Sequence, residues 1–177
     1  PAGLSADNGA TARELADFAG YLIEHHPGVL HYFSLPSFTY PREKNFVEGH
    51  WERSITQWNR NRLLRSYPGA DGFKTGFIEA SQYNLIATAE RGGRRLIAVL
   101  LGVPGESHAE GGEARALEAR RLLDYGYEGF ELVRPALPQI APLRVYGGRR
   151  ERVSPALGEV KPILLPRGRS EELQGRY

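Results

Sequence analysis

Lys74, Thr75 and Gly76 stand together in the stretch DGFKTGF, which immediately precedes two apolar runs. An ammonium group attracts an anion, a hydroxyl offers a second donor, and a glycine lets another backbone lie alongside because it has no side chain. A strand with these residues at the edge of a cleft suits a peptide that ends in a carboxylate. Taken alone, however, the tripeptide favours a simpler interpretation, a solvated lysine near a turn.

Two nearly unbroken apolar runs, residues 83–89 and 96–101, follow the tripeptide. Gly92 and Gly93 lie between them and supply the conformational freedom that a tight reversal needs. Strands that are apolar on both faces must be covered on both faces. The pattern therefore predicts an antiparallel hairpin inside a sheet, with helices packed over it.

Two segments have helical periodicity. Thr11 and Glu14 fit a capping box, and apolar residues then recur at helical spacing until Pro27, so residues 11–25 are expected to form an amphipathic helix on an apolar surface. A second helix is expected over residues 113–125, with Gly126 as its stop and with Ala116, Ala119, Leu122 and Leu123 on one side. Between Leu30 and Trp58 the composition favours short strands and loops.

Length and composition limit the organisation of the chain. With 177 residues, 41% hydrophobic and 25% charged, the sequence has room for one well-buried core and part of a second unit. After about Glu131 the sequence changes to short β-like segments separated by prolines. This change predicts a domain boundary between residues 1–130 and 131–177. A net charge of +2 without a basic stripe argues against a nucleic-acid partner.

Other candidate sites are weak. The five histidines lack the spacing of metal ligands, so neither a metal nor a cofactor is expected. Asn59 and Asn61 precede the Lys-Thr-Gly strand, and asparagines in that position usually satisfy loop backbone. We therefore interpret both as structural supports for the strand edge.

The string NRNRLLRSYPGADGFKTGFIEASQYNLIATAERGGRRLIAVLLG, with EARALEARRLLDYGYEGFE after it, closely resembles the penicillin-binding D-alanyl-D-alanine carboxypeptidases of the serine β-lactamase-like superfamily. The resemblance extends along most of the chain. It implies an α/β (α+β) fold, with a transpeptidase-like antiparallel sheet, covering helices and the start of a small β-rich domain. Phe77, where some members carry histidine, and Ser81-Gln82-Tyr83, in place of Ala-Gly-Tyr, depart from the family pattern.

The family resemblance implies acyl transfer by an activated serine. In this mechanism the serine of an S-x-x-K motif attacks the bond between two D-alanines, an S-x-N motif helps to move protons, and water cleaves the acyl-enzyme. Lys74 would provide positive potential, Thr75 would bind the substrate carboxylate, and Gly76 would allow close approach. The backbone N–H of Phe77 would be an oxyanion-hole donor, and such donors are worth roughly 3–4 kcal/mol in the transition state.

Arg115 is a further candidate from the resemblance, because it falls where the family has an arginine implicated in holding the terminal carboxylate. A guanidinium fork suits that task. The alternative is a solvent-facing helix arginine with no such role.

The two remaining motifs are absent from these 177 residues. None of the nine serines has a lysine three positions later, and none begins S-x-N. The chain also contains no methionine. We therefore expect the nucleophile to lie before Pro1, on an N-terminal segment or on a companion chain.

The sequence is compatible with three functions. The leading one is a serine-type carboxypeptidase of the bacterial envelope, acting on peptidoglycan stem peptides that end in D-Ala-D-Ala and acylated by β-lactams. A DD-endopeptidase or β-lactamase on the same fold is the second. A non-catalytic peptidoglycan-binding module is the third.

Overall fold

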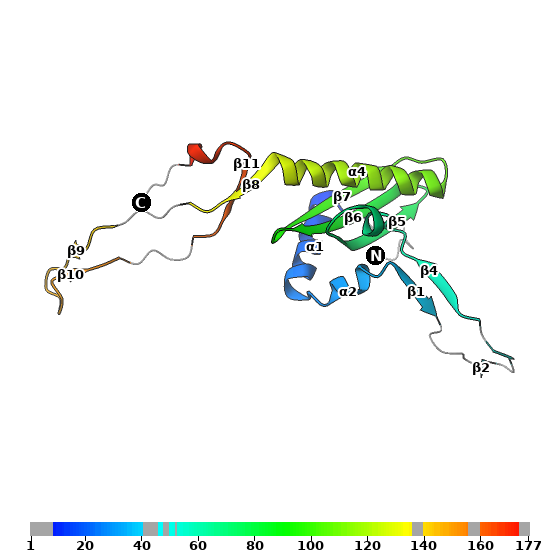
Figure 1. Cartoon of the computed structure of the whole chain (residues 1–177), viewed down its shortest axis with the longest axis horizontal. Helices are drawn as coiled ribbons and strands as arrows, with labels where there is room; N and C mark the ends of the chain where they lie inside the picture. The colour runs from blue at the N-terminus through cyan, green and yellow to red at the C-terminus, as the bar shows by residue number, and fades with distance from the viewer. Residues whose placement is uncertain are drawn as a thin grey trace. The chain divides into compact units, whose positions relative to one another are not determined.

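The computed structural model describes residues 9–40, 46–47, 50–51, 53–135, 140–155 and 160–173. The chain forms two compact units, Pro1–Asp124 and Tyr125–Tyr177. The first unit contains helices and a three-stranded sheet, and the second contains short paired strands (Figure 1).

The sheet of the first unit consists of β5 (Ala70–Ile78), β6 (Gln82–Arg91) and β7 (Arg94–Val103), all antiparallel and in the order β5-β6-β7. The predicted hairpin is confirmed, since β6 and β7 pair with Ala87 opposite Ala98. Gly92 and Gly93 both adopt positive φ, +57° and +73°, which is the conformation that a two-residue turn of matching twist requires. The register is therefore set by the turn that the two glycines permit.

One face of the sheet lies under α4 (His108–Gly129). Alternate residues of β6 are buried on this face, namely Tyr83, Leu85, Ala87 and Ala89. Gly111 of α4 lies so close to Tyr83 that an added Cβ would overlap the ring. The apolar side of the helix that meets the sheet contains Ala116, Ala119 and Leu123.

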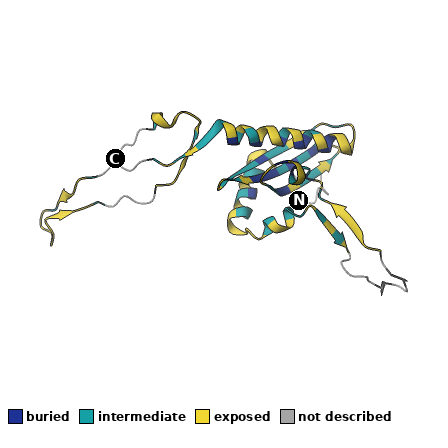
Figure 2. Ribbon diagram, in the orientation of Figure 1, coloured by how far each residue is buried: buried dark blue, intermediate teal, exposed yellow. Residues whose placement is uncertain are grey.

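The opposite face of the sheet lies against α1 (Ala12–His25) and α2 (Val29–Phe33). Gly20 of α1 lies near Ile97 of β7, and Phe33 of α2 lies near Gly72 of β5. Thr88, the residue of β6 that is fully buried here, belongs to this face. The expectation that helices cover both faces is confirmed, and Figure 2 shows the buried colour concentrated on the sheet between them.

The start of α1 has the predicted chemistry. The Thr11 hydroxyl accepts a hydrogen bond from the backbone N–H of Glu14 at 3.2 Å, and the Glu14 carboxylate accepts one from the backbone N–H of Thr11 at 2.8 Å. These contacts satisfy two N–H groups that a helix start would otherwise leave unpaired. The capping box is therefore confirmed.

Helix α4 differs from the prediction in two respects. It begins before Glu113 and continues through Gly126 to Gly129, because a glycine in a helix interior costs only about 1 kcal/mol relative to alanine. Leu122 was expected on the buried side and is 47% exposed, whereas Leu123 is 1% exposed. Consecutive helical residues point about 100° apart, so only one of the two leucines can face the sheet.

The segment between residues 29 and 66 contains helices that the sequence did not predict, α2 and the single turn α3 (Leu63–Ser66). Its predicted strands are present. β1 (Ser37–Tyr40) pairs with β4 (Ile55–Trp58), and β2 (Phe46–Val47) pairs with β3 (His50–Trp51).

The second unit is built from the last turn of α4 and two strand pairs. β8 (Phe130–Val133) pairs with β11 (Ile163–Pro166), and β9 (Leu143–Arg144) pairs with β10 (Arg152–Val153). A 3-10 turn, η1, follows at Ser170–Glu172. Among the described residues no helix is both long and apolar enough to cross a membrane.

The close contact between α4 and the sheet leads to a stability prediction. Gly111→Ala is expected to destabilise the fold by about 2–3 kcal/mol, because the new methyl group would overlap the Tyr83 ring. For a chain of this size the midpoint of thermal unfolding should fall by about 5–10 °C. The matched control is the adjacent Gly112→Ala, whose Cβ would lie 3.4 Å from Arg62 Nε. An equal loss of stability in both variants would contradict this account of α4 packing.

Candidate active site

The Lys-Thr-Gly residues lie on β5, the strand that ends the sheet order. The side chain of Lys74 is exposed, and its Nζ donates a hydrogen bond to the carbonyl oxygen of Thr75 at 2.5 Å. The Thr75 hydroxyl makes no hydrogen bond within the described part of the chain. The ammonium and the hydroxyl therefore belong to neighbouring residues of one edge strand of this sheet.

The direction of the backbone groups on β5 follows from Arg115. Its Nη1 lies 3.2 Å from the carbonyl oxygen of Gly76 and 3.3 Å from that of Asn84, the residue opposite Gly76 in the register. Two carbonyl oxygens so close to one atom indicate a pair of residues that exchange backbone hydrogen bonds. Since alternate residues of an antiparallel strand turn their backbone groups to opposite sides, the N–H of Phe77 points away from β6, toward the edge.

Gly76 has space around it. An added Cβ would meet only the side chain of Asn84, at 3.6 Å, which is an ordinary contact distance. Packing inside the protein therefore does not require glycine at this position.

An aromatic cluster holds the side chain of Phe77 on the α4 side. The Phe77 ring lies 4.5 Å from the Tyr83 ring and 4.9 Å from the His108 ring, measured between centroids. Tyr83 Oη and His108 Nδ1 are 3.2 Å apart and share a hydrogen bond. His108 is thus a neighbour of the site that the sequence did not reveal. Within the described ranges, no three metal-ligating side chains gather into a possible metal site.

Arg115 is 6% exposed, so the alternative of a solvent-facing helix arginine is wrong. Besides Gly76 and Asn84, its guanidinium donates to the carbonyl oxygen of Arg60, at 3.3 Å. Burial lowers the pKa of Arg115; the positive charges of Arg60 and Arg62 lower it further, while Tyr83 acts in the opposite direction. No carboxylate of the described residues forms an ion pair with Arg115. Within the described part of the chain the guanidinium therefore donates its hydrogen bonds to backbone carbonyl oxygens.

Arg60 and Arg62 are brought close to Arg115 by the loop before α3. Arg62 forms an ion pair with Glu113 and donates to the carbonyl oxygen of Ala109 at 3.1 Å. Arg60 is exposed. Neither arginine was predicted as a neighbour of the site, although Arg60 lies in the run Asn59-Arg60-Asn61, which is part of the family resemblance.

Of the two asparagines in that run, Asn61 supports β5 as predicted, whereas Asn59 bonds to other parts of the chain. The Asn61 side chain, 2% exposed, donates to the carbonyl oxygen of Gly72 on β5 at 2.8 Å and accepts from the N–H of Leu63 at 3.2 Å. The Asn59 side chain donates to the carbonyl oxygens of Phe33 and Leu35 and accepts from the N–H of Asn61. Both asparagines therefore attach the loop to its neighbouring elements.

Known proteins are similar to this chain both in sequence and in structure. DacA of Haemophilus influenzae, a D-alanyl-D-alanine carboxypeptidase, is 32% identical over the whole of this chain and over 42% of its own length. DacC of Escherichia coli, also a D-alanyl-D-alanine carboxypeptidase, is 34% identical over 95% of this chain and 38% of its own length. The chain thus spans less than half the length of these relatives.

Solved structures share the fold. Penicillin binding protein 5 of Haemophilus influenzae matches 95% of this chain, and 45% of its own chain, with a TM-score of 0.70 and 31% identity. Penicillin binding protein 6B of Escherichia coli matches 93% of this chain, and 42% of its own, with a TM-score of 0.60 and 30% identity. The mixed fold expected from the resemblance, an antiparallel sheet with covering helices, is confirmed. Since the model of peptidase S11, D-alanyl-D-alanine carboxypeptidase, matches residues 1–105, the chain belongs to the D-alanyl-D-alanine carboxypeptidase family.

Proposed function

We propose that the protein carrying this chain is a serine-type D-Ala-D-Ala carboxypeptidase, which removes the terminal D-alanine from peptidoglycan stem peptides and is acylated by penicillin. The observation that carries the proposal is the edge of β5. It presents the Lys74 ammonium, the Thr75 hydroxyl and the outward backbone of Phe77 beside a buried arginine that has no ion pair among the described residues. The proposed division of the chain assigns residues 1–130 to the catalytic domain and 131–177 to the start of a β-rich domain.

The proposed reaction proceeds in two steps. A serine attacks the carbonyl carbon of the penultimate D-alanine, the C–N bond breaks, and free D-alanine leaves with the proton that a paired base took from the serine. Water then hydrolyses the acyl-enzyme and restores the serine. In both steps the N–H of Phe77 stabilises the oxyanion of the tetrahedral intermediate, and Lys74 stabilises the same developing charge.

Binding of the substrate relies on the remaining residues. Thr75 donates its free hydroxyl to the terminal carboxylate, and Gly76 allows the peptide backbone to approach β5. Arg115 attracts the carboxylate by its charge and through the guanidinium N–H groups that are not used on Gly76, Asn84 and Arg60.

The nucleophile and its base belong to residues outside these 177, because none of the nine serines begins an S-x-x-K or an S-x-N motif. An N-terminal segment or a companion chain is the proposed source. The proposed location is the bacterial cell envelope, on the periplasmic side or at the outer face of the cytoplasmic membrane, where stem peptides occur.

The experiment that tests the proposal uses the intact protein, meaning the protein with both these residues and the serine motifs. It is incubated separately with a pentapeptide ending in D-Ala-D-Ala, with a cross-linked stem-peptide dimer and with a β-lactam. Release of D-alanine from the pentapeptide, together with a long-lived β-lactam adduct, is expected. Faster cleavage of the dimer would indicate a DD-endopeptidase, and rapid β-lactam turnover a β-lactamase. Binding of all three without covalent chemistry would leave a non-catalytic module.

Arg115 provides a second prediction for the intact protein. Arg115→Ala is expected to lower kcat/KM about tenfold for a peptide with a free terminal carboxylate, because one charged hydrogen-bonding partner is lost. The same peptide with a terminal amide is expected to lose much less. Equal losses on the two peptides would show that Arg115 only supports the backbone of Gly76 and Asn84, and D-alanine release is the measurement.

A further inference from the structure

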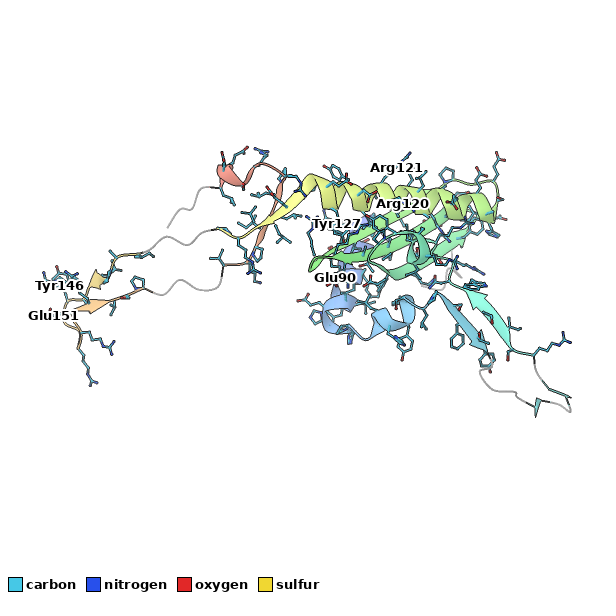
Figure 3. All side chains as sticks on the ribbon, viewed as in Figure 1. Glu90, Arg120, Arg121, Tyr127, Tyr146 and Glu151 are labelled. Carbon is cyan, nitrogen blue, oxygen red and sulfur yellow. The ribbon has the colours of Figure 1, made fainter. Side chains whose placement is uncertain are left out.

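The hairpin formed by β9, β10 and the loop between them, residues 143–153, is called the arginine hairpin below. It contains four arginines and one acidic residue, Glu151, and all five side chains are exposed; the arginines are Arg144, Arg149, Arg150 and Arg152. Figure 3 labels Tyr146 and Glu151 at this hairpin. Positive charge is therefore concentrated in eleven residues of a chain whose net charge is only +2.

The charges of the arginine hairpin are not neutralised by the described part of the chain. Elsewhere in the described ranges arginines do form ion pairs, for example Arg121 with Glu118 and Arg95 with Asp71, whereas none is found for the arginines of the hairpin. Arg144 and Arg152 even stand directly opposite each other in the strand register. Like charges in that position destabilise a strand pair, so folding alone gives no reason for them.

Tyr146 adds an exposed aromatic ring to this charge. It is 83% exposed, and the Arg144 guanidinium lies 5.3 Å from the centre of its ring. A tyrosine combines an apolar body with a polar tip and is enriched at membrane interfaces for that reason. Clustered arginines bind the anionic phosphates of lipid headgroups. The two features together match one kind of surface, an anionic lipid bilayer.

Charged residues on short strands also have a simpler use, because they prevent strands of different molecules from pairing. Mixed charges would serve that purpose equally well and would avoid the Arg144–Arg152 opposition. An exposed tyrosine does not serve it at all. Protection of the strand edge therefore explains part of the composition, but it does not explain the excess of positive charge or the exposed Tyr146.

We propose that the arginine hairpin rests on an anionic phospholipid surface, with its arginines on the phosphates and Tyr146 at the depth of the headgroups. The contact is independent of the catalytic proposal and would persist in an inactive protein. Each arginine near such a surface strengthens partitioning by about fivefold. Four arginines and one tyrosine thus give a weak, salt-sensitive contact that orients this unit on a membrane.

The test measures binding of the intact protein to vesicles of phosphatidylcholine alone and of phosphatidylcholine with 30% phosphatidylglycerol. Arg149→Gln/Arg150→Gln is expected to lower partitioning onto the anionic vesicles about 20- to 30-fold, with no change on neutral vesicles. The matched control is Arg120→Gln/Arg121→Gln, a second pair of consecutive arginines, labelled on α4 in Figure 3. This control removes the same charge and is expected to change partitioning less than twofold. Equal effects of the two double variants would overturn the proposal.

A second measurement reports on the hairpin directly. These 177 residues contain no cysteine, so Tyr146→Cys gives one labelling site within them for an environment-sensitive fluorophore such as NBD. Anionic vesicles are expected to shift its emission to the blue, and 0.5 M salt, at which charges are screened beyond roughly 4 Å, should reverse the shift. Vesicle binding without a change in emission would overturn the proposal. So would a response to a soluble polyanion, such as polyphosphate, that exceeds the response to vesicles.

Discussion

Replacing Lys74 with alanine is expected to slow acylation of the intact protein by penicillin by about 100- to 1,000-fold. The ammonium lies at the edge of β5. In the proposed reaction, negative charge develops on the oxyanion at this edge, and the carboxylate of the ligand binds there. Removing it takes away an interaction that is stronger in the transition state than in the free enzyme. The loss is therefore expected in the acylation rate constant more than in the initial binding of penicillin.

The fold of the Lys74→Ala variant is expected to remain nearly unchanged. The Lys74 side chain is exposed, and its hydrogen bond within the described residues joins only the neighbouring carbonyl of Thr75. Acylation is measured with a fluorescent penicillin, and folding is measured by thermal unfolding. Lys161→Ala, which removes another exposed lysine, serves as the control. Acylation at the normal rate in the Lys74 variant would remove the proposed role of the Lys-Thr-Gly strand.

Local signals in the sequence were sufficient to predict the hairpin of the sheet and the start of the first helix. Gly92 and Gly93 between two apolar runs determined the β6–β7 hairpin, and Thr11 with Glu14 determined the start of α1. These features depend on residues that are neighbours in the chain. The helix α2 and the length of α4 were not predictable in the same way, because packing on the sheet stabilises helical turns whose own sequence has no strong signal.

The candidate site was only partly accessible from the sequence. The Lys-Thr-Gly motif placed Lys74, Thr75 and Gly76 on one strand, and Asn61 was correctly predicted to support that strand. The hydrogen bonds of Arg115 and the contact of His108 with Phe77 join residues that are 31 or more positions apart. No periodicity reports such contacts, because they arise only when α4 is packed against the sheet. The catalytic and binding roles of the five site residues stay predictions.

The 177-residue chain, expressed as it stands, is expected to form no covalent adduct with penicillin. Covalent catalysis by serine requires a base within hydrogen-bond reach of the hydroxyl. None of the nine serines begins the S-x-x-K motif of the proposed mechanism, and Lys74 itself bonds to a backbone carbonyl. The role proposed for the edge of β5 is to stabilise an oxyanion, and that oxyanion forms only after a nucleophile has attacked penicillin.

The measurement is intact-mass spectrometry after incubation of the purified chain with a fluorescent penicillin, and the intact protein under the same conditions is the positive control. The control should gain the mass of one penicillin, and the 177-residue chain should gain none. Mixing the chain with a separately produced segment that contains S-x-x-K and S-x-N tests whether both parts form one site. If they do, the adduct should appear on the added segment and should depend on Lys74. A stoichiometric adduct on one of the nine serines of the chain alone would place the nucleophile inside these residues and contradict the proposed division of the site.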